Sequence, residues 1–117
     1  MPAIDSQAFE DRYGCSAPLP LLTFLNDDSV RASLPAAFIL ENVGFALEIQ
    51  YLLDIENPEN YDASNKKLTF AMTTDGLELL VDLTDHAGDI YQDEFGDIDH
   101  IGISMQDLVS ATRRPLG

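Results

Sequence analysis

The sequence predicts an α+β domain in which helices at the N-terminus and one at the C-terminus pack on one face of an antiparallel β-sheet meander. Helical patterns fill the first third of the chain, and alternating apolar and polar residues fill most of the rest. A capped helical pattern then follows the last alternating segment. Because 117 residues is the usual size of one domain, we expect residues 1–117 to form a single unit.

The first third of the chain carries helix start and stop signals. Asp5 or Ser6 can cap a short helix that Gly14 ends. Pro18 suits the first turn of a second helix. The polar run 26–29 ends that helix, and Asp28 or Ser29 can cap one more turn. We therefore expect two helices and a further helical turn before the sheet begins.

The middle of the chain follows the period of two that a half-buried strand requires. In the segment that begins at residue 45, we expect Phe45 and Tyr51 to be core residues on one apolar face, which consists of Phe45, Leu47, Ile49, Tyr51, Leu53 and Ile55. Asp75-Gly76 indicates a tight hairpin turn, because both positions of such a turn need a positive φ. A polar loop over 56–67 and an acidic turn over 93–97 separate other segments. The expected strands cover residues 37–41, 45–55, 68–72, 77–83, 89–92 and 98–103.

The C-terminal segment has the pattern of a capped helix. Ser104 followed three residues later by Asp107 resembles a capping box. The expected apolar face of this helix consists of Met105, Leu108, Val109 and Thr112. Arg113 and Arg114 would then lie at the helix C-terminus, where positive charge suits the helix dipole.

The charge balance is strongly acidic. The chain has twenty-one Asp and Glu residues and six Lys and Arg residues, which gives a formal charge of −15. This argues against nucleic acid and anionic membranes as partners, because both need basic surfaces. It favours a basic protein partner, although solubility or a saline habitat would explain the same composition.

Three features of the sequence bear on the cellular compartment, and all three suit the cytoplasm. Cys15 is the only cysteine, so no intrachain disulfide can form, and this suits a reducing compartment. The N-terminus does not resemble a signal peptide, and no apolar run reaches the length of a membrane span. We expect a cytoplasmic protein.

Several segments, in order, resemble the SUKH superfamily. The matching residues are Phe9-Glu10, Tyr13-Gly14, Pro18 with Leu21 and Phe24-Leu25, then 68–71, 74–76, 79–83, 88–91, 103–104 and 107–109. Ala17-Pro18 stands where the superfamily has Leu-Pro, and residues 34–65 match no motif. The resemblance implies a SUKH-like fold and a bacterial immunity protein that binds and blocks a cognate toxin, often a nuclease. It also leaves open a non-catalytic regulatory or adaptor module.

The candidate binding residues lie in the most acidic part of the chain. Residues 68–112 contain ten acids and no Lys or Arg, mostly at turns or outward strand positions. An acidic face there could occupy the substrate site of a basic toxin, although a merely solvated surface is the alternative. The predicted partner-binding residues are Asp75, Glu78, Asp82, Asp85, Asp89, Asp93, Glu94, Phe95, Asp97 and Asp99.

A third hypothesis, a small enzyme or metal protein, finds less support in the sequence. No nucleophile elbow, P-loop or dinucleotide fingerprint occurs, and the chain has no Trp to form a sugar platform. The acids and histidines between Asp85 and His100 do not follow the order of an EF-hand, and zinc ligands are scattered. We expect no catalytic residue, metal or cofactor.

Overall fold

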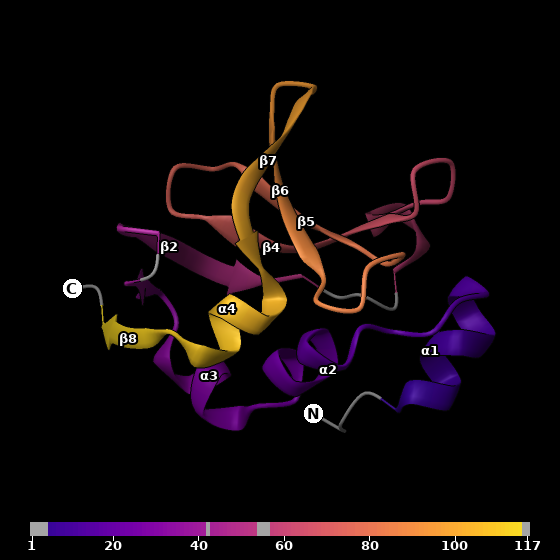
Figure 1. The fold of residues 1–117 in the computed structure, drawn as a ribbon, viewed down its shortest axis with the longest axis horizontal. Coiled ribbons are helices and arrows are strands. Elements are labelled where there is room, and N and C mark those ends of the chain that lie inside the picture. The colour runs from indigo at the N-terminus through magenta and orange to yellow at the C-terminus, as the bar shows by residue number, and fades with distance from the viewer. Residues whose placement is uncertain (1–4, 42, 54–56, 116–117) are drawn as a thin grey trace.

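A computed structural model of the protein describes residues 5–41, 43–53 and 57–115, and it shows a curled antiparallel sheet with helices against one side (Figure 1). The helices are α1 (Ser6–Tyr13), α2 (Leu19–Leu25), α3 (Asp28–Ser33), the 3-10 turn η1 (Pro58–Asn60) and α4 (Met105–Ser110). The strands are β1 (Ala36–Leu40), β2 (Phe45–Leu52), β3 (Tyr61–Asp62), β4 (Lys67–Thr73), β5 (Glu78–Asp82), β6 (Asp89–Glu94), β7 (Asp97–Ser104) and β8 (Thr112–Pro115). The predicted α+β class and antiparallel sheet are confirmed.

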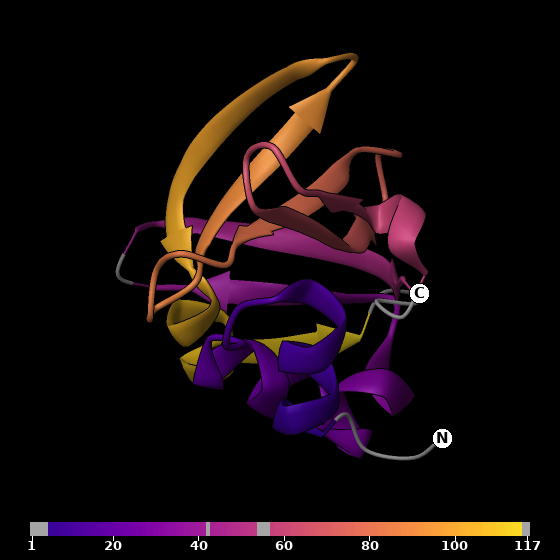
Figure 2. The same cartoon turned by 90° about the vertical axis from the view of Figure 1, so that its right-hand side faces the viewer.

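The strand order in the sheet is β7-β6-β5-β4-β2-β1-β8, and the short β3 pairs with β4. Every pairing is antiparallel. Apart from β3, the strands from β1 to β7 follow one another in chain order, as a meander should. β8 breaks that order, because the chain returns after α4 to pair with β1 at the far edge (Figure 2).

Local capping explains where the N-terminal helices begin and end. The Asp5 carboxylate accepts from the backbone N–H of Gln7, and Gly14 ends α1 with a φ of 71°. Pro18 takes the N-cap position of α2. α3 begins at Asp27, whose carboxylate accepts from the backbone N–H of Ser29 at 2.9 Å and from its hydroxyl at 2.6 Å. The predicted starts of the first two helices are confirmed. The third helix is capped by Asp27 and not by Asp28 or Ser29, because the Asp27 carboxylate is the one that accepts from an N–H of the first turn.

Replacing Asp27 with Ala should destabilise the protein by about 1 kcal/mol at neutral pH, because α3 loses its cap. The hydrogen bond from Ser29 is the main cause that lowers the pKa of Asp27 below 3.8. A carboxyl whose pKa is lowered by folding stabilises the protein above its unfolded pKa, and this contribution disappears as the pH falls through the folded pKa. Urea denaturation of both proteins at neutral and acidic pH should therefore show a difference that shrinks in acid.

The core lies between the helices and the sheet. Phe24 of α2 packs against Phe38 of β1 and Phe70 of β4, with ring centroids 5.5 and 6.3 Å apart. Met105 and Leu108 of α4 are also buried there. The aromatic cluster thus joins the first helices to two strands that are not neighbours in the sheet.

One predicted apolar strand face is only partly buried. Leu47 and Ile49 of β2 lie in the core, but Phe45 is 38% exposed and Tyr51 is 47% exposed. The prediction that both aromatic residues are core residues was wrong. Phe45 lies at the first position of β2 beside a turn, and the pairing with β4 shifts register between Ile49 and Tyr51. Ile55, predicted on the same face, lies outside the described residues.

The C-terminal helix is shorter than predicted. The capping box of Ser104 and Asp107 is confirmed, but α4 ends at Ser110. Thr112–Pro115 forms β8, so Thr112 is not on a helix and Arg113 and Arg114 are not at a helix end. Pairing with β1 satisfies an otherwise open sheet edge. In addition, the Arg113 guanidinium donates to the Ser29 hydroxyl at 3.0 Å and ties β8 to α3.

Candidate binding surface

The β6–β7 hairpin projects beyond the other strands (Figures 1 and 2). β6 continues to Glu94 and β7 begins at Asp97, so the loop consists of Phe95 and Gly96 alone. Their φ values are 52° and 96°, as a type I′ turn requires. The Asp93 carboxylate accepts from the Gly96 N–H at 2.8 Å. The predicted acidic turn over 93–97 is therefore a two-residue turn between two strand ends.

The tight turn predicted at Asp75-Gly76 has a different form. Gly76 has a φ of 84°, but Asp75 does not have a positive φ. The Thr73 N–H donates to the Leu77 carbonyl, and the Leu77 N–H donates to the Thr73 hydroxyl, so three residues lie between the bonded pair. Because Glu78 pairs with Asp93, this turn lies at the same end of the sheet as the hairpin tip.

Phe95 at the tip is 98% exposed. An aromatic residue gains no burial at such a position, and a positive φ costs an L-residue with a Cβ about 1–2 kcal/mol. Ile98, three residues further along β7, is 40% exposed. The free protein therefore presents two large apolar side chains at the end of a projecting hairpin.

The strand pairings place the predicted acids on two sides of the hairpin. Leu79, Val81 and Ile90 face the core, so the residues that alternate with them face away from the helices. The acids facing away are Glu78, Asp82, Asp89 and Asp93. Glu94, Asp97 and Asp99 are on the other side, where they are exposed beyond the end of the core. Acids therefore cover both sides of the tip instead of one face.

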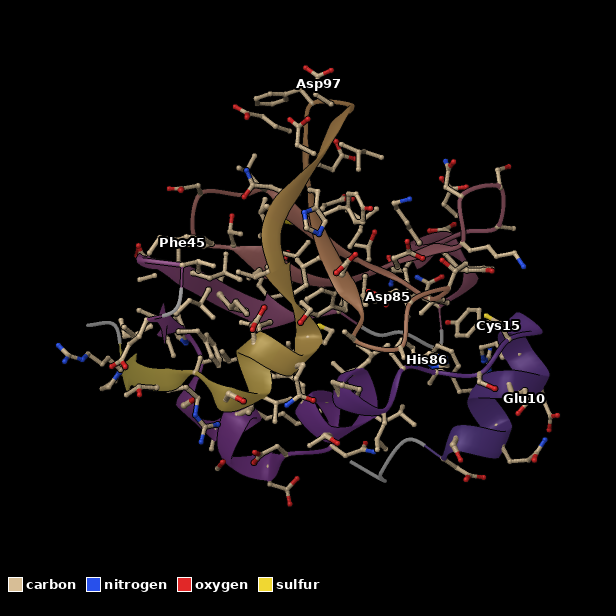
Figure 3. All side chains as sticks on the ribbon, viewed as in Figure 1. Glu10, Cys15, Phe45, Asp85, His86 and Asp97 are labelled. Carbon is tan, nitrogen blue, oxygen red and sulfur yellow. The ribbon has the colours of Figure 1, made fainter. Side chains whose placement is uncertain are left out.

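Three of the predicted acids lie at the base of the hairpin, where a lysine and a histidine are strand neighbours of two of them. This base cluster consists of Asp82, Asp85 and Asp89. Asp82 is directly opposite Lys67 of β4, and the His100 imidazole lies 3.6 Å from the Asp89 carboxylate. Figure 3 shows Asp85 well away from Asp97 at the tip.

The ring of Tyr91 contacts the two basic residues beside the base cluster. The Lys67 ammonium lies 4.6 Å from the centre of its ring, and the His100 ring meets it edge-on at 5.1 Å. Burial raises the pKa of Tyr91, and the nearby carboxylates raise it further. Lys67, Tyr91 and His100 therefore pack together beside the carboxylates of the base cluster.

Folding raises the pKa of Asp89 in the base cluster. Burial raises the pKa of Asp89, as does neighbouring Asp85, while His100 acts in the opposite direction. Since the folded protein binds this proton more readily, the contribution of Asp89 to stability decreases as the pH rises through its raised pKa.

The acids at the tip have no comparable compensation. The tip cluster consists of Glu78, Asp93, Glu94, Asp97 and Asp99. Within the described ranges, no basic side chain lies within ion-pair distance of any of them. Glu78 is directly opposite Asp93, and Glu94 is directly opposite Asp97. Like charges in such positions destabilise a sheet. The tip therefore concentrates negative charge at a cost to stability.

Sequence reasoning did not assign Lys67, Tyr91, His100 or Ile98 to the site. Each has a strand neighbour that the sequence does not specify, because pairing across β4 to β7 decides which side chains meet. For Ile98 a signal existed, since an alternating strand directly follows Phe95-Gly96. Of the predicted residues, Asp75 is exposed in the β4–β5 turn and belongs to neither cluster as defined.

The described part of the chain offers little to other kinds of site. No group of three or more His, Cys, Asp or Glu residues there is arranged to hold a metal ion. A shallow pocket near the base cluster is lined by Pro18, Leu83, Asp85 and His86 among others. None of the helices in the described ranges combines the length and apolarity needed to cross a membrane.

Comparisons with known proteins identify no similar protein. No family model matches the chain, and neither a curated protein nor a solved structure is significantly similar to it.

Proposed function

We propose that the protein acts by binding a basic protein partner, with the tip of the β6–β7 hairpin as its recognition surface. The observation that carries this proposal is Phe95, which is 98% exposed in a positive-φ turn among uncompensated acids. Aromatic side chains are frequent anchors of protein interfaces. The surrounding carboxylates would guide a basic partner to this anchor and determine which partners are accepted.

The energetic features of the tip support a binding role over a merely solubilising one. A soluble surface needs scattered charges, and it needs neither an exposed Phe at positive φ nor like-charge pairs across strands. Glu78 opposite Asp93 and Glu94 opposite Asp97 both disfavour the folded sheet. Local features that oppose stability are expected at functional sites. A basic partner would relieve both repulsions and bury the apolar groups.

The biological role that we propose follows the resemblance to the SUKH superfamily. In that role the partner is a toxin domain, such as a nuclease, and the protein is an immunity protein in the cytoplasm of the producing cell. A nuclease has a basic substrate site because it binds phosphates. The acidic hairpin would enter that site in place of nucleic acid. No catalytic group, metal or cofactor of this chain takes part in such an inhibition.

The experiment uses the protein encoded by the adjacent gene, purified separately and tested for toxin activity such as nuclease activity. Addition of this chain should abolish the activity at a 1:1 ratio, and calorimetry should show tight binding. Leu19→Ala is a matched control, since Leu19 is 75% exposed on α2, away from the hairpin. Binding without inhibition would favour the adaptor role. Absence of binding to this protein would remove the immunity proposal.

A further inference from the structure

β7 forms one end of the sheet, and its outer edge is open. In the part of the chain that the structure describes, β6 is the one strand that pairs with β7. Asp97, Ile98, Asp99 and His100 are all exposed. The opposite end of the sheet is β8, which has four residues and ends at Pro115. Figure 2 shows β7 along the rim of the projecting hairpin.

The turn geometry identifies which backbone groups face outward. In a two-residue hairpin the residues that flank the loop, here Glu94 and Asp97, exchange hydrogen bonds. Because bonded and non-bonded pairs alternate along an antiparallel ladder, the pair Asp93 and Ile98 is not bonded. By the same alternation, the N–H and C=O of Ile98 and His100 point away from β6. These four groups form the template for an added strand.

A register shift limits the length of this edge. Asp89 is opposite Ser104 while Tyr91 is opposite His100, so β7 bulges between these pairs. Gly102 within the bulge has a φ of 81°, and its N–H donates to His100 Nδ1 at 3.1 Å. The regular edge is therefore Asp97–His100, which spans roughly 13 Å.

We infer that this edge binds an extended, basic segment of the partner by strand addition. The inference rests on the proposed function and specifies how the partner is held. Asp97 and Asp99 flank the edge on one side of the hairpin, with Glu94 beside them, so Lys or Arg at alternate positions of an added strand would meet carboxylates. Ile98 on the other side would meet an apolar residue.

A second copy of this chain fits the edge less well. Each copy carries a formal charge of −15. Pairing of β7 with its own copy would bring Asp97 and Asp99 of both chains together, and like charges across strands are destabilising. The favoured occupant is a basic segment of another protein.

The test uses two acetylated and amidated peptides, Lys-Val-Lys-Val-Lys and Glu-Val-Glu-Val-Glu, with amide hydrogen exchange followed by NMR. In the free protein the amides of Ile98 and His100 should exchange rapidly, and those of Asp97 and Asp99 should be protected. Saturation with the basic peptide should slow exchange at Ile98 and His100 about tenfold or more. The acidic peptide should leave all four rates unchanged.

A variant provides a second measurement. Ile98→Pro removes an outward N–H without removing a bond to β6, and should weaken binding of the basic peptide about tenfold or more. Ile98→Val keeps that N–H and should bind normally. If the proline variant does not fold, the exchange rates of the unaltered protein decide the question.

The outcomes separate this inference from the proposed function. If the basic peptide and the purified partner bind but exchange at Ile98 and His100 is unchanged, strand addition is wrong and hairpin recognition stands. If the partner does not bind at all, both proposals fail. Protection of these amides without peptide, together with concentration-dependent assembly, would identify a second copy as the occupant and overturn the inference.

Discussion

Replacing Phe95 with Asn should lower the affinity for the basic partner about 100-fold and raise the stability of the free protein. Asn-Gly is the preferred pair for a type I′ turn, because Asn adopts a positive φ more readily than Phe. Since Phe95 is 98% exposed, its removal takes no packing from the core. A central aromatic anchor contributes about 2 kcal/mol or more to binding, and a 100-fold loss corresponds to about 2.7 kcal/mol.

Two measurements on one variant test this trade-off. Urea denaturation should show stabilisation of about 1 kcal/mol, as expected when a strained turn residue is relieved. Calorimetry with the partner should show the loss of affinity, and Leu19→Ala should change neither quantity by as much. A Phe95→Asn variant that binds as tightly as the unaltered protein would remove Phe95 from the recognition surface.

Replacing Gly88 with Ala should destabilise the protein by about 2–3 kcal/mol, the largest loss expected from a single added methyl group. Gly88 precedes β6 and has a φ of 73°. An added Cβ would lie 3.0 Å from Met105 Cγ and 3.2 Å from Val81 Cγ2. Both neighbours are fully buried, and the Gly88 carbonyl accepts from the Met105 N–H at 2.8 Å. The energetic costs of backbone strain and of overpacking therefore add to each other.

Gly76→Ala is the matched control for this substitution. Gly76 has a φ of 84°, but a Cβ there would have no neighbour within 4 Å. This control should lose about 1 kcal/mol, from backbone strain alone. Denaturation midpoints of the two variants measure the packing contribution as their difference. Equal losses would mean that the loop before β6 moves away from α4 without resistance.

Local signals in the sequence predicted most of the elements. Asp5, Gly14 and Ser104 determine helix ends through bonds to residues two to four positions away, so the sequence alone reveals them. β8 has no such signal, because Thr112–Pro115 lacks an apolar alternation and becomes a strand by pairing with distant β1. The exposure of Tyr51 likewise depends on a register shift against β4.

The candidate site was predictable in composition but not in arrangement. The acids and Phe95 could be selected because they lie in one segment without Lys or Arg. Their division into a base cluster with basic neighbours and a tip cluster without them depends on register, since the folded sheet places Lys67 opposite Asp82 and His100 3.6 Å from Asp89. Charge density in the sequence therefore could not distinguish acids with basic neighbours from acids without them.

The association rate constant with the purified partner, measured by stopped flow across salt concentrations, tests the central claim most directly. The tip-neutralised variant Glu94→Gln, Asp97→Asn, Asp99→Asn is compared with Glu10→Gln, Asp11→Asn, Asp28→Asn, which removes the same charge from α1 and α3. The rate for the unaltered protein should fall at least tenfold between about 0.02 and 0.5 M salt, as screening shortens the range of the field. Neutralising the tip should remove most of this dependence, and the helix variant should retain it. A rate that is flat with salt, or equal slopes for the two variants, would contradict recognition by the acidic hairpin.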